Sequence, residues 1–253
     1  LTITAESKEV TYGDIVPTYT VSYNGLVNNE TSSVLGGTLS FVSSYSQTSN
    51  VGEYDIAASG LTSENYEITY VDGKVIVSQK EVGLTWGETQ FTYNGSSQLP
   101  TVTLTGLVNN DTCEVTVKGE QINAGSYEAT VTALSNGNYK LPVNVTTDYV
   151  INKATHNMSG IAFNDVTVTY DGNEHEVVLG GTLPSGVEVT YTTNKGTNAG
   201  TYNAVATFTY DTANYNVIEN KTATLTINKA TYDMTGIKFS DVTVTYDGNE
   251  HEV

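Results

Sequence analysis

The chain is poor in the residues that support disulfide bonding, nucleic-acid binding or membrane insertion. It has one cysteine, Cys113, so no intrachain disulfide can form, although small extracellular domains often contain disulfides. Ten lysines and arginines face 28 aspartates and glutamates, which gives a net charge of −18 and argues against nucleic acid or anionic lipid as a partner. The sequence has no run of 18 apolar residues, so we expect no membrane insertion of this segment.

Threonine, serine, asparagine and glycine supply most of the polar residues, and 18 tyrosines supply most of the aromatic ones. Threonine and tyrosine favour strands, whereas asparagine and glycine favour turns. Apolar and polar residues alternate over segments such as 166–170, 187–191 and 223–227, which is the pattern of half-buried strands. No part of the chain has a helical apolar stripe, so the sequence predicts an all-β protein.

Three motifs recur at a spacing of about 75 residues and divide the chain into modules. The pattern Asn-x-Gly-x-Tyr occurs three times, and an Asn-Tyr pair follows each copy. A lysine then closes each module, always at the same distance from the tyrosine of the pair. We therefore predict three complete modules and a truncated fourth. Their bounds are residues 1–79, 80–152, 153–228 and 229–253.

Each complete module is expected to be a small immunoglobulin-like β-sandwich of about seven strands. A β-grasp-like fold is the alternative, because residues 28–35 have the composition of one helical turn. Asp72-Gly73 lies between two alternating runs and predicts a tight hairpin. No Gly/Ser-rich or Pro-rich linker separates the modules, so we expect an elongated, semi-rigid array.

The last 24 residues repeat an earlier part of the chain. Residues 230–253 match residues 154–177 at 19 of 24 positions, and they end about one third of the way into a module. We expect the sequence to be a window of a longer protein. Within the remnant, residues 236–239 and 242–246 are expected to favour strands but to lack a partner sheet.

The tyrosine of each Asn-x-Gly-x-Tyr motif is expected to serve the core. These residues are Tyr54, Tyr127 and Tyr202. A tyrosine at such a position buries its ring and passes its hydroxyl to a backbone group, as in the tyrosine corner of sandwich folds. Stacking against a ligand is the alternative role.

The sequence predicts no catalytic, cofactor-binding or metal-binding residue, and hence no enzyme. Glu174, His175 and Glu176 alternate on a strand and point to opposite faces, so they do not converge on one ion. Cys113 is expected to lie on a strand and has no recognisable base or metal partner nearby. Asp-x-Asp-x-Asp spacing is absent, so Ca²⁺ at the module junctions is retained only as a minor alternative. An isopeptide bond is not expected either, because the closing lysines (Lys80, Lys153 and Lys229) lie at module edges.

The recurring motifs resemble those of the MBG/YDG-type repeats of bacterial surface proteins. The resemblance is carried by Tyr12-Gly13, Tyr170-Asp171-Gly172 and Tyr246-Asp247-Gly248, by the two repeated motifs above, and by Ile-Asn-Lys-Ala at 151–154 and 227–230. Module 2 departs from the pattern with Asn94 in place of the aspartate. The resemblance implies stalk repeats of a secreted or wall-anchored, adhesin-like protein, located at the cell surface or cell wall.

Three functions fit these expectations. The first is a structural stalk or spacer whose partners are neighbouring repeats of the same chain, with host glycan or protein contacted through other domains. The second is direct binding of host glycan or protein by the repeats. The third is a spacer within a large secreted enzyme.

Overall fold

The computed structural model describes residues 1–252, which form 21 strands, one short 3-10 turn and no α-helix. The chain divides into two compact units, Leu1–Asn152 and a second that begins at Lys153. Modules 1 and 2 lie in the first unit, and module 3 lies in the second. Each unit is described by itself.

Module 1 consists of two sheets with seven strands. One sheet has the order β3-β1-β6 and the other has the order β2-β7-β5-β4. The elements are β1 (Thr2–Ala5), β2 (Lys8–Thr11), β3 (Val21–Asn24), the 3-10 turn (Ser32–Val34), β4 (Gly36–Ser43), β5 (Gly52–Thr62), β6 (Thr69–Val71) and β7 (Gly73–Ser78).

Module 2 has a four-stranded sheet, β10-β15-β13-β12, and two strand pairs, β11-β9 and β14-β8. Its strands are β8 (Lys80–Glu81), β9 (Gly83–Trp86), β10 (Gln90–Thr92), β11 (Val102–Thr105), β12 (Val115–Lys118), β13 (Gly125–Leu134), β14 (Tyr139–Lys140) and β15 (Thr146–Asn152).

Module 3 has a four-stranded sheet, β16-β21-β20-β18, and one strand pair, β17-β19. Its strands are β16 (Val166–Thr169), β17 (His175–Glu176), β18 (Glu188–Thr192), β19 (Lys195–Gly196), β20 (Gly200–Thr209) and β21 (Lys221–Asn228).

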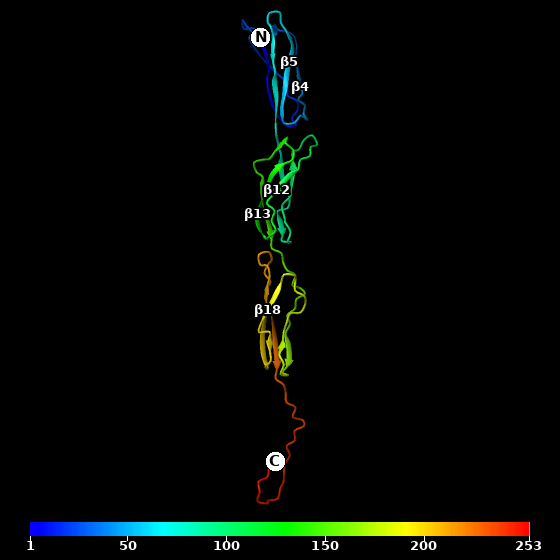
Figure 1. Cartoon of the computed structure of the whole chain (residues 1–253), viewed down its shortest axis with the longest axis vertical. Coiled ribbons are helices and arrows are strands. Elements are labelled where there is room, and N and C mark those ends of the chain that lie inside the picture. Colours follow the sequence, from blue (N-terminus) through cyan, green and yellow to red (C-terminus); the bar gives the residue numbers. More distant parts are fainter. Residues whose placement is uncertain (253) are drawn as a thin grey trace. The chain divides into compact units, whose positions relative to one another are not determined.

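The four-stranded sheet has the same plan in all three modules. Its first edge strand runs parallel to the closing strand of the module, as β2 does to β7, and the other pairings are antiparallel. On its other side the closing strand pairs with the strand that carries the Asn-x-Gly-x-Tyr motif, as β7 does with β5. Figure 1 shows the far edge of this sheet in module 1, where β4 and β5 lie side by side.

Alternation along the closing strands builds the cores. In β7 every second residue is buried, and Val75 and Val77 are the apolar ones. Ala5 of the opposite sheet packs with Ile56 and Val75 in one cluster, so the two sheets of module 1 form a sandwich. The prediction of all-β, immunoglobulin-like modules is confirmed. The β-grasp alternative is not adopted, because the helical segment is only the three residues Ser32–Val34 and cannot cover a sheet.

The predicted hairpin at Asp72-Gly73 is wrong. β6 pairs with β1, whereas β7 pairs with β2 and β5, so the chain crosses between sheets at Asp72. A Cβ atom on Gly73 would lie 2.3 Å from the carbonyl oxygen of Ala5. The glycine therefore serves this close crossing instead of a reversal of the chain.

The C-terminal segment forms no strand within its described residues. The apolar side chains at 236–239 and 242–246 are exposed, with Phe239 at 84% and Tyr246 at 94%. The nearly identical residues Val166–Thr169 form β16, paired with β21. The same local sequence thus becomes a strand only where a partner strand is present.

Candidate functional site: a junction between modules 1 and 2

The three motif tyrosines share one hydrogen bond. The hydroxyls of Tyr54, Tyr127 and Tyr202 donate to the backbone carbonyls of the motif asparagines Asn50, Asn123 and Asn198, at 2.8, 2.9 and 2.9 Å. Each ring packs against the core of its module and is partly buried. Each tyrosine hydroxyl thus binds the backbone just before its own strand, and the expected bond to a backbone group is present. The rings are less buried than those of fully internal residues.

The Glu-His-Glu segment of module 3 divides between two partners. Lys195 Nζ lies 3.3 Å from a carboxylate oxygen of Glu174 and 3.2 Å from one of Glu176. His175 Nε2 instead lies 2.9 Å from Asp171 Oδ1. The three side chains therefore do not converge on one point. Hydrogen bonds to the two carboxylates raise the pKa of Lys195, and the bond to Glu176 is the largest cause.

Asp171 closes a local turn. Its carboxylate accepts a hydrogen bond from the backbone N–H of Asn173 at 2.9 Å and contacts His175. These bonds lower the pKa of Asp171 below its ordinary value, and the bond from the Asn173 backbone is the largest cause. The turn is repeated in the C-terminal segment, where Asp247 contacts Asn249 and His251.

Cys113 and the closing lysines have structural positions. Cys113 was expected on a strand, but it lies just before β12. It packs against the cluster shared by modules 1 and 2. The backbone of Lys80 pairs with Tyr139, and Lys153 Nζ donates to the carbonyl of Thr212 at 2.6 Å.

The most elaborate polar arrangement lies where modules 1 and 2 meet. Asp111 Oδ2 accepts hydrogen bonds from the hydroxyls of Tyr12 at 2.9 Å and Tyr139 at 2.7 Å. The two rings meet edge to face, with centroids 5.5 Å apart, and are only 3% and 2% exposed. One carboxylate from module 2 thus joins a tyrosine of each module in a part-buried contact, and hydrogen bonds to a charged group are stronger than those between neutral groups.

Backbone contacts fix the position of Tyr139. Its hydroxyl accepts a hydrogen bond from the N–H of Val108 at 2.9 Å. Burial is the largest cause that raises the pKa of Tyr139, to about 12. The backbone bond from Val108 opposes this shift, and the bond to Asp111 adds to it. The hydroxyl therefore stays protonated and able to donate at any physiological pH.

Asn138 adds a second set of contacts beside the tyrosines. Its Oδ1 accepts from the N–H of Val51 at 3.0 Å, and its Nδ2 donates to Asn50 Oδ1 at 2.9 Å. Gln79 Nε2 donates to the carbonyl of Gly137 at 2.9 Å. The Asn-x-Gly-x-Tyr turn of module 1 is thereby held by the Asn-Tyr pair of module 2.

Gly13 allows the two modules to approach closely. It has φ +90°, and a Cβ atom there would lie 2.6 Å from Val108 Cγ2. Tyr12, Val82 and Tyr139 belong to one buried cluster with Ile56 and Val75. The core of module 1 therefore continues into module 2.

Sequence reasoning identifies these motifs but not their role. The Asn-Tyr pair and the shared Gly-Leu-Val-Asn-Asn segment, residues 25–29 and 106–110, stand out in the sequence only as repeats. A usable signal is present, because the segment ends on an acid in both modules, Glu30 and Asp111. No local pattern shows that this acid reaches a tyrosine 99 residues away.

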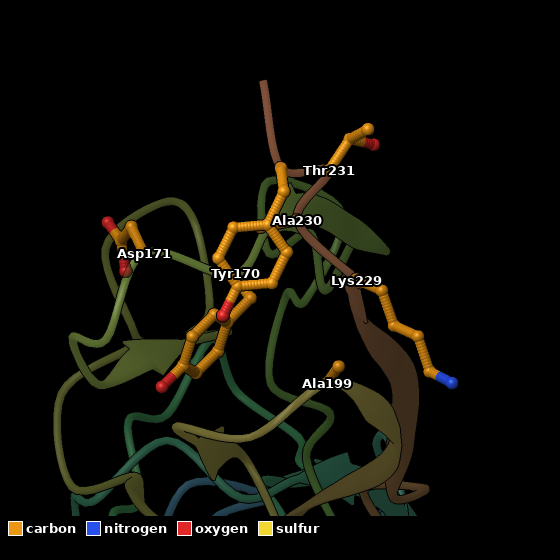
Figure 2. A pocket seen from close by; sticks show the side chains of 7 residues that line it. Tyr170, Asp171, Ala199, Lys229, Ala230 and Thr231 are labelled. Carbon is orange, nitrogen blue, oxygen red and sulfur yellow. The ribbon is translucent and has the colours of Figure 1, made fainter. Parts of the chain in front are cut away.

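Module 3 has a hollow at the end that corresponds to the Tyr12 end of module 1. Its volume is about 540 Å³, and its lining residues are Tyr170, Asp171, Ala199, Lys229, Ala230, Thr231 and Tyr232. Tyr170 and Ala199 occupy the positions of Tyr12 and Val51. Figure 2 shows Tyr170, Ala199 and Ala230 around the hollow and the Lys229 side chain pointing away from it.

Residues 1–252 contain no group of three histidines, cysteines, aspartates or glutamates placed to hold a metal ion. A Ca²⁺ ion takes six to eight oxygen ligands, and the carboxylate of Asp111 is already engaged by two tyrosine hydroxyls. No helix in the same residues is long and apolar enough to cross a membrane.

Comparison with solved structures returns weak likenesses to multi-domain chains. Immunoglobulin domains 1–5 of Sidekick-1 are 11% identical, with 89% of this chain and 58% of that chain covered and a TM-score of 0.30. A variant of titin domains I67–I69 is 9% identical, with 90% and 96% covered and a TM-score of 0.25. Three N-terminal domains of the bacteriophage RB49 outer capsid protein Hoc are 13% identical, with 85% and 93% covered and a TM-score of 0.24. The comparison with curated proteins gave no match.

The sheets themselves define the class as tandem immunoglobulin-like β modules. Two family matches make it more specific. The MBG domain of YGX type matches residues 1–76, and the MBG domain matches residues 159–231. The chain therefore belongs to the MBG-type tandem-repeat proteins, which confirms the resemblance of its motifs.

Proposed function

We propose that this chain is a structural spacer, a series of MBG modules that holds other parts of a protein apart. The observation that carries the proposal is the junction at Asp111, which joins modules 1 and 2 through buried tyrosines instead of a flexible linker. A spacer needs such junctions, because unstructured links let the modules fold back on each other.

The proposed setting is the surface or wall of a bacterial cell, in a secreted, adhesin-like protein. The acidic, threonine-rich composition and the family match support this setting. The proposal assigns no catalytic residue and no cofactor. It includes no nucleic-acid partner, since the net charge of −18 repels phosphates.

Direct glycan binding is a second candidate, favoured by the hollow in module 3. Tyr170 is 42% exposed and Tyr232 is 91% exposed, and exposed aromatic rings offer apolar faces for stacking. A glycan and mucin array tests it with the whole chain and a Tyr170→Ala variant. Binding that the variant loses supports this candidate.

The spacer role is tested by displaying the chain on a bacterial surface with a fluorescent tag at its outer end. Removing residues 80–152 takes out one module and should lower the tag by about 27 Å or more, the length of a strand of about eight residues. A Val143→Ser variant, altered at a valine that is 93% exposed, is the control and should leave the height unchanged. A tag height independent of module number would contradict the proposal.

A further inference from the structure

The end of module 1 that does not contact module 2 carries a second copy of the surface with which module 2 binds module 1. In module 2 this docking surface is formed by Val108, Asp111, Asn138 and Tyr139. The matching residues of module 1 are Val27, Glu30, Asn65 and Tyr66. No sequence feature assigns them a role.

The turn that supports the surface has the same backbone conformation in both modules. Asn28 and Asn29 have φ of 54° and 58°, and Asn109 and Asn110 have φ of 56° and 57°. The turn is closed in the same way, with Glu30 N–H donating to the Val27 carbonyl at 3.0 Å and Asp111 N–H to the Val108 carbonyl at 2.9 Å. Two successive non-glycine residues in the left-handed region are uncommon, so their repetition marks a shared, specified geometry.

The tyrosine and the carboxylate are also already assembled in module 1. The Tyr66 hydroxyl donates to Glu30 Oε2 and accepts from the Val27 N–H at 3.1 Å. These contacts reproduce those among Tyr139, Asp111 and Val108. The hydrogen bond to Glu30 is the first cause of the raised pKa of Tyr66, so this hydroxyl remains a donor to Glu30.

The two copies differ in what covers them. Val108 packs against Gly13 of module 1, and Tyr139 is 2% exposed. Val27 is 55% exposed, and Tyr66 is only partly buried. In module 2 the carboxylate accepts from two tyrosines, its own and Tyr12; in module 1 Glu30 accepts from Tyr66, and a carboxylate has room for further donors.

We propose that Val27, Glu30, Asn65 and Tyr66 form a docking surface for the Tyr-Gly end of another MBG module joined ahead of module 1 in the same chain. The incoming module supplies a tyrosine hydroxyl in the position of Tyr12 to Glu30. It supplies a glycine in the position of Gly13 to Val27, and an Asn-x turn in the positions of Asn50 and Val51 to Asn65. The Glu30 carboxylate favours a module end that offers a hydroxyl donor. The exposed Val27 side chain favours a module end that has a glycine at the contact, because a Cβ atom there would clash with it.

Strand registers set where such a module must be joined. Thr105 and Asn24 are each followed by Gly-Leu-Val, and they pair with Gly83 and Thr2 respectively. Leu1 is therefore the counterpart of Val82. The incoming module must then supply the counterparts of Lys80 and Glu81 directly before Leu1. Covalent joining matters because it raises the effective concentration of a small interface to the millimolar range.

The test compares the 253-residue chain with a four-module chain in which residues 1–81 are placed ahead of Leu1. The added copy carries Val27→Asp, so that its peptides differ in mass from those of the original module 1. Hydrogen exchange is then followed by mass spectrometry in residues 24–31 of the original module. We expect exchange there to slow about tenfold or more in the four-module chain.

Two variants of the four-module chain identify the contact. Tyr12→Phe in the added copy removes the hydroxyl offered to Glu30 but keeps the ring, and it should return exchange toward the rate of the chain without the added module. Glu9→Gln in the original module changes an exposed carboxylate on β2, away from this surface, and should leave the protection intact. Equal exchange in the two chains, or protection that survives Tyr12→Phe, would overturn the proposal.

Sedimentation of the chain without the added module separates this occupant from a second copy of the molecule. A monomer is expected at concentrations up to roughly 100 micromolar, on the order expected for a small untethered interface. A dimer that Val27→Asp abolishes would instead assign the surface to a second copy and overturn the proposal. The proposal concerns how modules join, so its failure would not by itself contradict the cellular setting proposed above.

Discussion

At the scale of single residues, the motif tyrosines bind the start of their own strand. Replacing Tyr202 with Phe removes the hydrogen bond to Asn198 and keeps the ring, so we expect module 3 to lose about 1 kcal/mol of stability. Tyr202→Ala also removes a partly buried ring and should cost about 3 kcal/mol. Hydrogen exchange of the amides in β20 measures both changes.

Tyr246→Phe is the matched control, because Tyr246 is 94% exposed. It should leave exchange in β20 unchanged within about 0.5 kcal/mol, as surface substitutions usually do. If Tyr202→Phe also had no effect on β20, the hydroxyl would have no stabilising role.

The Asp171 turn predicts a local pH dependence. A pKa lowered in the folded state means that the stabilising contribution is complete above the ordinary pKa of 3.8 and is lost as the pH falls through the lowered value. Asp247 forms the same turn without a surrounding module, and its pKa is lowered too, with the backbone of Asn249 as the first cause. NMR titration of the Asn173 and Asn249 amides should therefore give similar midpoints below 3.8. A normal midpoint for Asp247 alone would show that the module, and not the turn, lowers the pKa.

Gly13 allows a clean test of the close approach between modules 1 and 2. Gly13→Ala introduces a Cβ atom 2.6 Å from Val108 at φ +90°, whereas Gly95→Ala introduces one at φ +77° with nothing within 4 Å. Both carry the strain of a left-handed alanine, about 1–2 kcal/mol, but Gly13→Ala should cost about 1–3 kcal/mol more through overpacking. We expect faster exchange at the Tyr139 amide in Gly13→Ala only. Equal effects of the two variants would show that the contact with Val108 is unimportant.

At the scale of elements, residues 230–252 and 154–176 separate local preference from tertiary support. The same turn forms at Asp171 and at Asp247, but the strand forms only where β21 lies beside it. Isolated strands without a partner sheet are marginal in water. Amides of Val166–Thr169 should therefore exchange slowly and those of residues 242–245 rapidly. Equal protection of the two segments would contradict this explanation and indicate that the C-terminal segment pairs elsewhere.

This comparison also explains how far the sequence predicts the fold. Alternation over 166–170, 187–191 and 223–227 locates β16, β18 and β21 closely, because each has one face toward a core. Gly13, Gly95 and Gly172 have positive φ, a conformation that glycine adopts without steric cost. Pairing partners do not follow from the same pattern. The hairpin predicted at Asp72-Gly73 is wrong because a tight turn and a crossing between sheets use the same residue types.

The junction between modules 1 and 2 is beyond local sequence patterns for a related reason. Tyr12, Asp111 and Tyr139 are far apart along the chain, and each is ordinary in its own segment. What the sequence does contain is the repetition of the Asn-Tyr pair and of the Leu-Val-Asn-Asn segment before an acid. Repetition indicates a shared role, but only the three-dimensional arrangement identifies that role as contact with the neighbouring module.

At the scale of the whole molecule, the proposed spacer depends on junctions that resist bending. The junction of modules 1 and 2 has a continuous apolar cluster and two tyrosines on one carboxylate. Contacts of this kind resist bending more than a Gly/Ser linker of equal length does. The proposal therefore predicts that the chain in solution is extended and does not fold back into a compact particle.

Small-angle X-ray scattering of the whole chain measures how extended it is in solution. Three modules with strands of about 27 Å each, plus loops, predict a maximum dimension of roughly 100 Å or more, and hence a radius of gyration of about 29 Å or above. A compact globule of this length has a radius of gyration of about 18 Å. For a spacer we expect a measured radius of gyration at or above the value for the extended chain, with the scattering of a rod-like particle. A measured radius of gyration close to that of the compact globule would contradict the spacer.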